Sequence, residues 1–434
     1  KVALHNLGCK VNAYETEAMQ QMLEAAGYEI VPFEPGADIY VINTCSVTNI
    51  ADRKSRQMLH KAKKMNPDAI VVAAGCYVQA DTKKAEADAS IDIIIGNNKK
   101  QELIPILESY RTGHQKTTEC VDINHTKEYE NLEIDRTEEH TRAYLKVQDG
   151  CNQFCTYCII PYARGRIRSK KTEDVVNEVK RLAASGCQEV VLTGIHLSSY
   201  GKERPENQEN LLTLIQAVHQ VGGIERIRLG SLEPGIITEE FAAAISSLPK
   251  VCPHFHLSLQ SGCTTTLKRM NRRYTAEEYR EKCKILRKYY PAPALTTDVI
   301  TGFPGETEEE FEESRSFVDS IHFYETHIFP YSKREGTKAA GMPDQLTEQV
   351  KKERSRILIA LGKEHQREYM EQFLGQEKEV LFEEQQTVEG QEYWTGHTME
   401  YLKIAVISEE NLENKRVMVQ LREMIGQDLI LAER

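Results

Sequence analysis

The chain has 434 residues, a formal net charge of −11 and 28% charged side chains. This length leaves room for two to four domains, and no apolar run approaches the ~20 residues of a membrane span. Eleven cysteines are too sparse, and odd in number, for a disulfide scaffold, while the acidic charge argues against nonspecific nucleic-acid binding by the whole surface.

The first 113 residues alternate between strand and helix patterns. Apolar runs predict strands at 2–7, 39–42, 70–74 and 91–95, and amphipathic stretches predict helices at 14–26 and 47–65. This βαβαβ order predicts a doubly wound parallel sheet.

Three cysteines follow three of these predicted strands directly. Cys9, Cys45 and Cys76 come at the carboxyl ends, which lie at one edge of a parallel sheet and bind ligands in open α/β folds. Three convergent thiolates predict an iron–sulfur cluster with one open iron. The alternative is three buried structural cysteines. Cysteines placed in this way favour metal chemistry in a reducing cytoplasm.

Residues 114–140 are polar, charged and aperiodic, so we interpret them as a linker, and Cys120 within it receives no role. A second α/β series follows over residues 141–370. Its six predicted strands indicate a partial (β/α)6 barrel with its working face at the carboxyl ends. These strands are expected at 144–148, 189–192, 226–229, 254–259, 295–300 and 326–330.

A second cysteine triplet follows the first strand of this series. Cys151, Cys155 and Cys158 have the spacing C-x3-C-x2-C, within the basic stretch Gly150–Lys171. Three thiolates this close can hold a [4Fe–4S] cluster whose fourth iron stays open for a ligand. Zinc would need a fourth ligand nearby, and the first candidate is His196, a strand away. The remaining alternative is three unrelated buried thiols.

Polar and glycine residues follow the other strands of the predicted barrel, as a nucleoside cofactor would require. In the fourth strand the polar residues His254, His256, Ser258 and Gln260 alternate with apolar ones, so one of the two faces must line the barrel interior. His254 and His256 could form a metal pair, although structural hydrogen bonding is the more ordinary role.

Residues 371–434 form a separate acidic tail, with 14 acidic against 6 basic side chains. Short alternating runs with turns between them predict a small β-barrel domain.

Several motifs together resemble the methylthiotransferase family of radical S-adenosylmethionine (SAM) enzymes, over essentially the whole chain. They are Leu7–Asn12, Asn43–Thr48, Gly75-Cys76, Gly150–Lys171, Leu259–Gly262, Gly302–Thr307 and Pro330–Ser332. The resemblance implies an amino-terminal domain with an auxiliary cluster, a central radical SAM barrel and a carboxyl-terminal TRAM domain.

The family's branches act on different substrates. Two methylthiolate adenosine 37 of tRNA, carrying either an isopentenyl or a threonylcarbamoyl group on N6, and the third modifies an aspartate of ribosomal protein S12. Lys10–Asn12 with Tyr14–Glu17, and the stretches Lys146–Cys151 and Ile159–Gly165, look most like the threonylcarbamoyladenosine branch.

The resemblance also implies the cofactors and their ligands. Cys151, Cys155 and Cys158 would hold the [4Fe–4S] cluster that cleaves SAM, and Cys9, Cys45 and Cys76 would hold the auxiliary [4Fe–4S] cluster that carries the sulfur. The C2 hydrogen of the adenine is then replaced by a methylthio group, so both clusters should face one cavity. The residues expected to contact SAM are Tyr157, Thr193, Gly194, Ser231, Glu233 and Gln260.

The target base lies in a single-stranded anticodon loop, where it can be splayed out. Arg164, Arg166 and Arg168 are the candidates for contacts with the RNA backbone. We expect a monomeric cytoplasmic enzyme that does not bind membranes and receives electrons from a reductant such as flavodoxin or ferredoxin. The alternative from another class is a non-enzymatic iron–sulfur electron carrier or RNA-binding protein.

Overall fold

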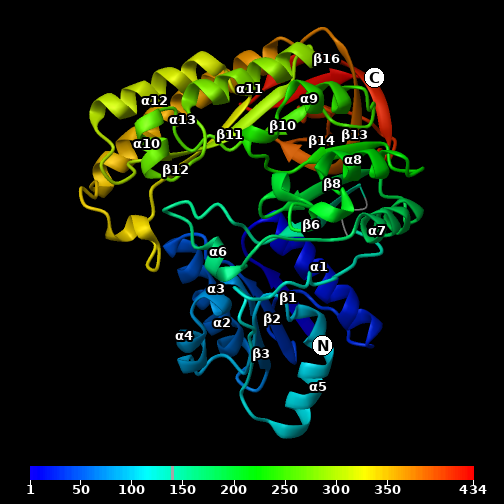
Figure 1. Cartoon of the computed structure of the whole chain (residues 1–434). Helices are drawn as coiled ribbons and strands as arrows, with labels where there is room; N and C mark the ends of the chain where they lie inside the picture. The colour runs from blue at the N-terminus through cyan, green and yellow to red at the C-terminus, as the bar shows by residue number, and fades with distance from the viewer. Residues whose placement is uncertain (138–140) are drawn as a thin grey trace.

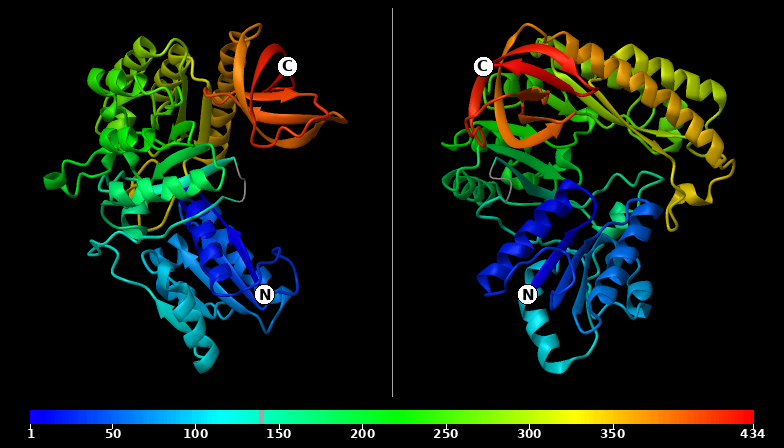
Figure 2. Two further views of the ribbon diagram at one scale, coloured as in Figure 1. Left: turned by 90° about the vertical axis from the view of Figure 1, so that its right-hand side faces the viewer. Right: turned by 180° about the vertical axis from the view of Figure 1, so that it is seen from behind.

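The computed structural model describes residues 1–137 and 141–434. The amino-terminal domain lies against a central curved sheet with its helices, and the carboxyl-terminal strands lie on the side of the central domain away from the amino-terminal one (Figures 1 and 2). Within the described ranges, no helix is long and apolar enough to cross a membrane.

The amino-terminal domain is a parallel sheet of order β1-β2-β3-β4-β5. A parallel bridge between Val2 and Ile30 adds one more short extended segment outside β1. After β1 the chain passes first through this outer segment and then crosses to the other side of β1, where β2, β3, β4 and β5 follow in order. This change of direction is the doubly wound arrangement that the sequence predicts. The elements are β1 (Val2–Asn6), α1 (Lys10–Ala25), β2 (Ile39–Thr44), α2 (Asn49–Met65), β3 (Ile70–Gly75), α3 (Cys76–Ala80), α4 (Thr82–Ala87), β4 (Ile93–Ile95), α5 (Leu103–Gly113) and β5 (Thr117–Glu119).

The two faces of this sheet are covered by different helices. Met19 and Leu23 of α1 pack with α5 on one face, whereas Leu59 of α2 packs with α3 and α4 on the other. The direction of winding changes between β1 and β2, and ligands bind at such a switch point in open α/β sheets. Cys9 and Cys45 follow these two strands.

Strand β5 lies within the segment predicted as a linker. It pairs with the edge strand β4, and its sequence Thr117-Thr118-Glu119 has no apolar side chain that would have indicated a strand. Further along the same segment, Leu132 and Ile134 are buried in the core of the central domain. Much of this connection therefore packs against the two domains that it joins.

The central domain contains all six predicted strands as β6, β8, β9, β10, β11 and β12. Parallel pairing joins β6-β8-β9 and β10-β11-β12, and the parallel bridges Ile227–Val251 and Leu232–Leu257 connect the two sheets into one partial barrel. The elements are β6 (Arg142–Asp149), α6 (Ile160–Ala163), β7 (Arg168–Ser169), α7 (Thr172–Ala184), β8 (Glu189–Gly194), α8 (Leu211–His219), β9 (Arg226–Leu229), α9 (Glu239–Ser246), β10 (His254–His256), α10 (Thr264–Arg269), α11 (Ala276–Tyr289), β11 (Ala294–Thr301), α12 (Glu308–Ile321), β12 (Glu325–Pro330) and α13 (Glu348–Glu371).

The apolar face of the barrel strands packs outward under the helices. Phe255, Leu257 and Leu259 belong to the same buried core as residues of α11 and α12. Because side chains alternate along a strand, His254 and His256 face the barrel interior. The polar face of this strand therefore lines the barrel interior. The sequence alone did not determine which of its two faces does so.

The carboxyl-terminal tail forms the predicted β-barrel, a closed sheet of order β13-β14-β15-β17-β16. Its Tyr401 ring lies 5.1 Å from the Arg142 guanidinium, 4.6 Å from that of Arg228 and 5.1 Å from the His254 ring, near the amino-terminal ends of the central strands. This domain closes the end of the barrel opposite the cysteines. The strands are β13 (Glu377–Val388), β14 (Gln391–His397), β15 (Lys403–Val406), β16 (Arg416–Ile425) and β17 (Leu429–Glu433).

Candidate active site

The first cysteine triplet lies at one edge of the amino-terminal sheet. Cys9 precedes α1, Cys45 follows β2, and Cys76 begins α3 directly after β3. Cys45 and Cys76 are buried, while Cys9 is exposed. A Cβ atom on Gly8, the residue before Cys9, would lie 3.0 Å from the Cys45 Sγ, and Thr44 before Cys45 pairs with Gly75 before Cys76. The structure thus brings these three residues together, as expected from their positions after parallel strands.

Side-chain hydrogen bonds fix the strand ends that carry this triplet. The Asn12 amide donates to the carbonyl oxygens of Leu7, at 2.7 Å, and Thr44, at 3.0 Å. The Thr44 hydroxyl donates to the Ala74 carbonyl at 2.5 Å. Asn12 and Thr44 therefore tie the ends of β1, β2 and β3 together beside the thiols, which explains the polar residues in the first two cysteine motifs.

Gly75 is needed at the turn between β3 and Cys76. Its φ of +98° lies in the region that favours glycine, and a Cβ atom there would lie 2.6 Å from the Asn43 side-chain oxygen. Only glycine lets the chain turn here so that Cys76 begins α3.

Arg164, from the central domain, reaches across to this triplet. Its Nε donates to the Cys76 Sγ at 3.2 Å, while its terminal nitrogens donate to Asn12, Glu15 and Asp149 at 2.7–3.2 Å. Asn97 adds a second donor to the Cys76 Sγ at 3.5 Å. The Cys76 sulfur therefore lies between two N–H donors, one from each domain.

The second triplet follows β6 at the carboxyl end of the central barrel. Gly150 has φ +70°, and a Cβ atom there would lie 1.9 Å from the Arg166 carbonyl oxygen, so the close return of the chain requires glycine. The Cys151 amide donates to the Gly165 carbonyl at 3.0 Å. Gly150 and this hydrogen bond close the segment 151–165 into a loop that carries all three cysteines.

Arg272 and Glu233 support this triplet. Arg272 donates to the Cys155 Sγ at 3.2 Å and to the Glu233 carboxylate at 3.1 Å. The same carboxylate lies 3.1 Å from the His196 Nε2. His196 and Arg272 hold the pKa of Glu233 below its usual value although burial opposes this. A chain of charged contacts thus connects Cys155 with the ends of β8 and β9.

The donor set fits iron–sulfur clusters better than single metal ions. Burial raises the pKa of the Cys45 and Cys151 thiols to about 11 and that of Cys158 to about 12, so binding to metal must release these protons. In neither triplet, both of which lie in the described part of the chain, are the three sulfur atoms all within 4.8 Å of one another. A tetrahedral zinc site needs closer sulfurs, whereas a [4Fe–4S] cube spreads them further apart.

Comparisons with known proteins agree with this chemistry. Residues 145–318 match the radical SAM superfamily, and residues 1–96 match an uncharacterized protein family designated UPF0004. Threonylcarbamoyladenosine tRNA methylthiotransferase MtaB of Bacillus subtilis is 42% identical over 97% of this chain and 93% of the relative. The chain belongs to the methylthiotransferase family of radical SAM enzymes. A tRNA-2-methylthio-N(6)-dimethylallyladenosine synthase of Moorella thermoacetica is 38% identical over 87% of this chain and 85% of its own.

Solved structures show the same fold at low sequence identity. The radical SAM methyltransferase TsrM of Kitasatospora setae has a TM-score of 0.56 with 15% identity, covering 76% of this chain and 72% of that one. Together, these comparisons confirm the resemblance to the methylthiotransferase family, the predicted fold class and the predicted cofactors, two clusters and SAM.

The residues that we expect to contact SAM in this methylthiotransferase all lie beside the second triplet or at the carboxyl ends of the barrel strands. Tyr157 is half-buried, its ring centroid 6.3 Å from that of Phe303. Thr193 and Gly194 end β8. Ser231 and Glu233 follow β9, and Gln260 follows β10 with φ +71°. Their contacts with SAM stay a prediction.

The sequence analysis missed the side chains that support the cysteines. Asn12, Glu15, Asp149 and Arg272 carry no metal-ligand pattern, because their role is to donate to or balance other groups. The sequence names His196 only as a zinc candidate, whereas the structure places it against Glu233. Arg272 lies in the basic run Lys268–Arg273, which the sequence shows as a charge cluster and gives no reason to connect with Cys155.

Two of the three predicted RNA contacts need correction. Arg164 is fully buried and Arg168 is 1% exposed. The Arg168 guanidinium donates to the carbonyl oxygens of Arg164 and Arg166. Both guanidinium groups are thus held by protein acceptors, and neither is available to a phosphate in this structure.

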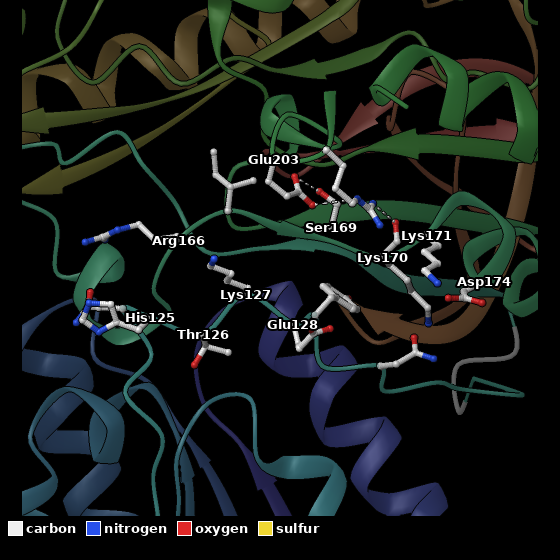
Figure 3. A pocket seen from close by; sticks show the side chains of 15 residues that line it. His125, Thr126, Lys127, Glu128, Arg166, Ser169, Lys170, Lys171, Asp174 and Glu203 are labelled. Carbon is white, nitrogen blue, oxygen red and sulfur yellow. Dashed lines mark hydrogen bonds and ion pairs between the residues drawn. The ribbon is translucent and has the colours of Figure 1, made fainter. Parts of the chain in front are cut away.

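Arg166 remains accessible beside a large open cleft (Figure 3). Its guanidinium lies 4.6 Å from the centre of the Phe154 ring. The cleft has a volume of about 840 Å³ and separates the 124–131 segment from residues 166–171. Its basic lining residues are His125, Lys127, Arg166, Lys170, Lys171 and Arg204, and its acidic ones are Glu128, Asp174 and Glu203.

Proposed function

We propose that this chain is a tRNA methylthiotransferase that replaces the C2 hydrogen of N6-threonylcarbamoyladenosine 37 with a methylthio group. The observation that carries the proposal is the convergence of two cysteine triplets on one domain interface. Arg164 follows Cys158 by six residues and donates to the Cys76 sulfur at 3.2 Å. Helix α6, which begins just after Cys158, also packs against α3, which begins with Cys76. A reaction that needs both clusters could occur in the space between them.

Cys151, Cys155 and Cys158 would hold one [4Fe–4S] cluster, and Cys9, Cys45 and Cys76 the other. When bound, the clusters and SAM supply the radical chemistry and the sulfur of the product. The protein's own residues position them. Arg272 and Glu233 orient the loop of the second triplet, and Tyr157, Thr193, Gly194, Ser231 and Gln260 provide contacts for the nucleoside and amino-acid ends of SAM.

The RNA would approach along the cleft beside Arg166, where Lys127 and Lys171 are exposed. An anticodon loop is single-stranded, so its base can leave the stack and enter the space between the domains. Phosphates on either side of the base would then meet Arg166, Lys127 and Lys171. These positive charges supply binding energy that depends on salt and not on base sequence.

The remaining partners follow from the reaction. An electron must be supplied for each cleavage of SAM, and a small reductant such as flavodoxin or ferredoxin would serve. The chain would work as a monomer in the cytoplasm, where tRNA is present and thiols stay reduced.

The two triplets give a test with separate readouts. In the anaerobically reconstituted protein, replacing Cys151, Cys155 and Cys158 together with alanine should abolish production of 5′-deoxyadenosine. Replacing Cys9, Cys45 and Cys76 should leave that production intact while no methylthio nucleoside forms. Methylthio product from the second variant would contradict the proposal, as would cleavage of SAM by the first.

A further inference from the structure

The interior of the central barrel is lined by polar side chains that remain accessible. On β12, His327 is exposed and Phe329 is 49% exposed, and the adjacent Asp298 side chain on β11 is 30% exposed. These residues occupy the inward-facing positions of their strands, because Leu295, Val299 and Ile328 pack outward in the helix-covered core. A barrel interior is normally filled by side chains. Accessible groups at this level therefore indicate space for a ligand.

Lys10 brings a positive charge to this interior from the amino-terminal domain. It follows Cys9 directly, and its Nζ lies 5.8 Å from the centre of the Tyr144 ring on β6. Its ammonium also interacts electrostatically with Arg228 on β9, Arg142 on β6, Glu189 on β8 and Glu325 on β12. Lys10 therefore reaches the charged groups of the central barrel from a position next to the auxiliary triplet.

The Lys10 ammonium has no close counter-charge in the described part of the chain. No carboxylate oxygen there lies within 4.0 Å of it, although nearby Lys146 and Lys100 both form such ion pairs with Glu15. The carboxylates of Glu189 and Glu325 act on this ammonium only from beyond ion-pair distance, and the Arg228 and Arg142 guanidiniums oppose it, so a ligand carboxylate in direct contact would add a favourable charge.

A group of hydrogen-bonding side chains faces the same space. The ligand atoms of His256, Asp298 and His327 all lie within 4.8 Å of one another. The His256 Nδ1 is 2.9 Å from the Thr296 hydroxyl, which leaves its buried Nε2 without a hydrogen-bond partner, 3.3 Å from the Asp298 carboxylate. This group offers both donors and acceptors to a polar ligand.

We propose that Lys10 binds the carboxylate of the threonylcarbamoyl group, and that His256, Asp298 and His327 bind its hydroxyl and urea groups. This inference rests on the proposed function and adds to it the residues that select the substituent on N6. The substituent would enter the barrel interior while the adenine stays near the two cysteine triplets. The exposed ring of Phe329, two residues closer to the barrel mouth than His327, offers an apolar face to the base.

The same residues would select against an apolar substituent. An isopentenyl group has no hydrogen-bonding atom, so its entry would remove water from Lys10, Asp298 and the histidines without replacing the lost hydrogen bonds. Sites built to bind polar groups reject analogues that lack them by large factors, because buried polar groups are left without partners. Selection between the two modified adenosines would thus take place inside the barrel.

The first test changes the substrate and leaves the protein intact. Anticodon stem-loops carry either N6-threonylcarbamoyladenosine or its uncharged carboxamide analogue, and binding and methylthiolation are measured with the reconstituted wild-type enzyme. Removing the charge should weaken binding and lower kcat/KM by about 30-fold or more, the usual cost of losing one partner of a buried charge pair. Equal binding of the two stem-loops would overturn the inference.

The second test assigns the charge to Lys10. The Lys10→Met variant should lose about 30-fold in binding the charged stem-loop, with no further loss on the carboxamide. Lys10→Arg should keep most of the binding, and Lys284→Met on the outside of α11 should bind as wild type. Iron content and reductive cleavage of SAM should be unchanged in all three. A Lys10→Met variant that still distinguishes the two stem-loops would contradict the assignment.

The outcomes separate this inference from the proposed function. If the wild-type enzyme methylthiolates neither stem-loop, the proposed function fails first. If it methylthiolates both equally well, the function holds and the role of Lys10 is wrong.

Discussion

At the scale of single residues, the same type of side chain has different roles over short distances. Arg164 and Arg166 are separated by one residue, but Arg164 is fully buried with six acceptor atoms of Cys76, Asn12, Glu15 and Asp149 around it. Arg166 stays accessible above the Phe154 ring. The sequence shows only a basic run here, because burial depends on which domain packs against it.

Replacing Arg164 with methionine should destabilise the protein by about 3–5 kcal/mol, because Glu15 and Asp149 would remain buried without their partner. The iron content of the auxiliary site should fall as well, since Cys76 loses a donor. Thermal unfolding and iron analysis would measure both effects. An Arg164→Met protein with wild-type stability and full iron content would show that the buried contacts contribute little.

Arg166→Ala should act on RNA binding alone. We expect weaker binding of tRNA and a salt dependence of log Kd that is less steep by about one unit, because one phosphate contact is lost. Stability and SAM cleavage should match wild type. Binding titrations at several salt concentrations decide the point, and an unchanged slope would leave Arg166 without a role at the phosphate backbone.

At the scale of elements, the pattern of apolar runs predicted both parallel sheets and the cysteines at their carboxyl ends. That prediction works because strand direction alone brings the ends together. Three strands were not predicted. Strand β5 is a polar three-residue edge strand, and β7 has two residues and pairs antiparallel with β6. Strand β14 is held by pairing with β13 and β15 and has no clear alternation of its own.

The turn after β3 allows a test of how these ends are built. Gly75→Ala would place a Cβ atom 2.6 Å from the Asn43 oxygen at a φ of +98°. Gly27→Ala is the matched control, since Gly27 has φ +86° and no atom within 4 Å of such a Cβ. Both should cost about 1–3 kcal/mol of backbone strain, and Gly75→Ala should cost more and lose auxiliary iron. Equal stability and iron content in the two variants would contradict this reason for Gly75.

At the scale of the whole molecule, the amino-terminal domain is attached to the barrel by a buried charged network. Glu15 on α1 pairs with Lys146 at 2.7 Å, Arg164 at 2.8 Å and Lys100 at 3.0 Å, and all four side chains are fully buried. Arg164, Lys100 and Lys146 hold the pKa of Glu15 well below its usual value although burial opposes this. Sequence patterns could not predict this network, because Glu15 is more than 80 residues from each of its three partners.

Glu15→Gln should therefore destabilise the protein at neutral pH by about 3 kcal/mol and expose the connection between the domains to protease. The lowered pKa means that the wild-type advantage is complete above the unfolded value of about 4.3 and is lost as the pH falls toward the folded value. Unfolding measured at pH 7 and pH 3 should show a large difference between the proteins that shrinks on acidification. A difference that is constant with pH would exclude the Glu15 charge as its source.

The most direct measurement for the proposed function is nucleoside mass spectrometry of a mixed tRNA pool. The pool carries both N6-threonylcarbamoyladenosine and N6-isopentenyladenosine, and it is incubated anaerobically with reconstituted enzyme, reductant and SAM. We predict that only the threonylcarbamoyl nucleoside gains a methylthio group. Methylthiolation of the isopentenyl nucleoside instead would contradict the substrate assignment, and 5′-deoxyadenosine without any modified nucleoside would contradict the action on tRNA.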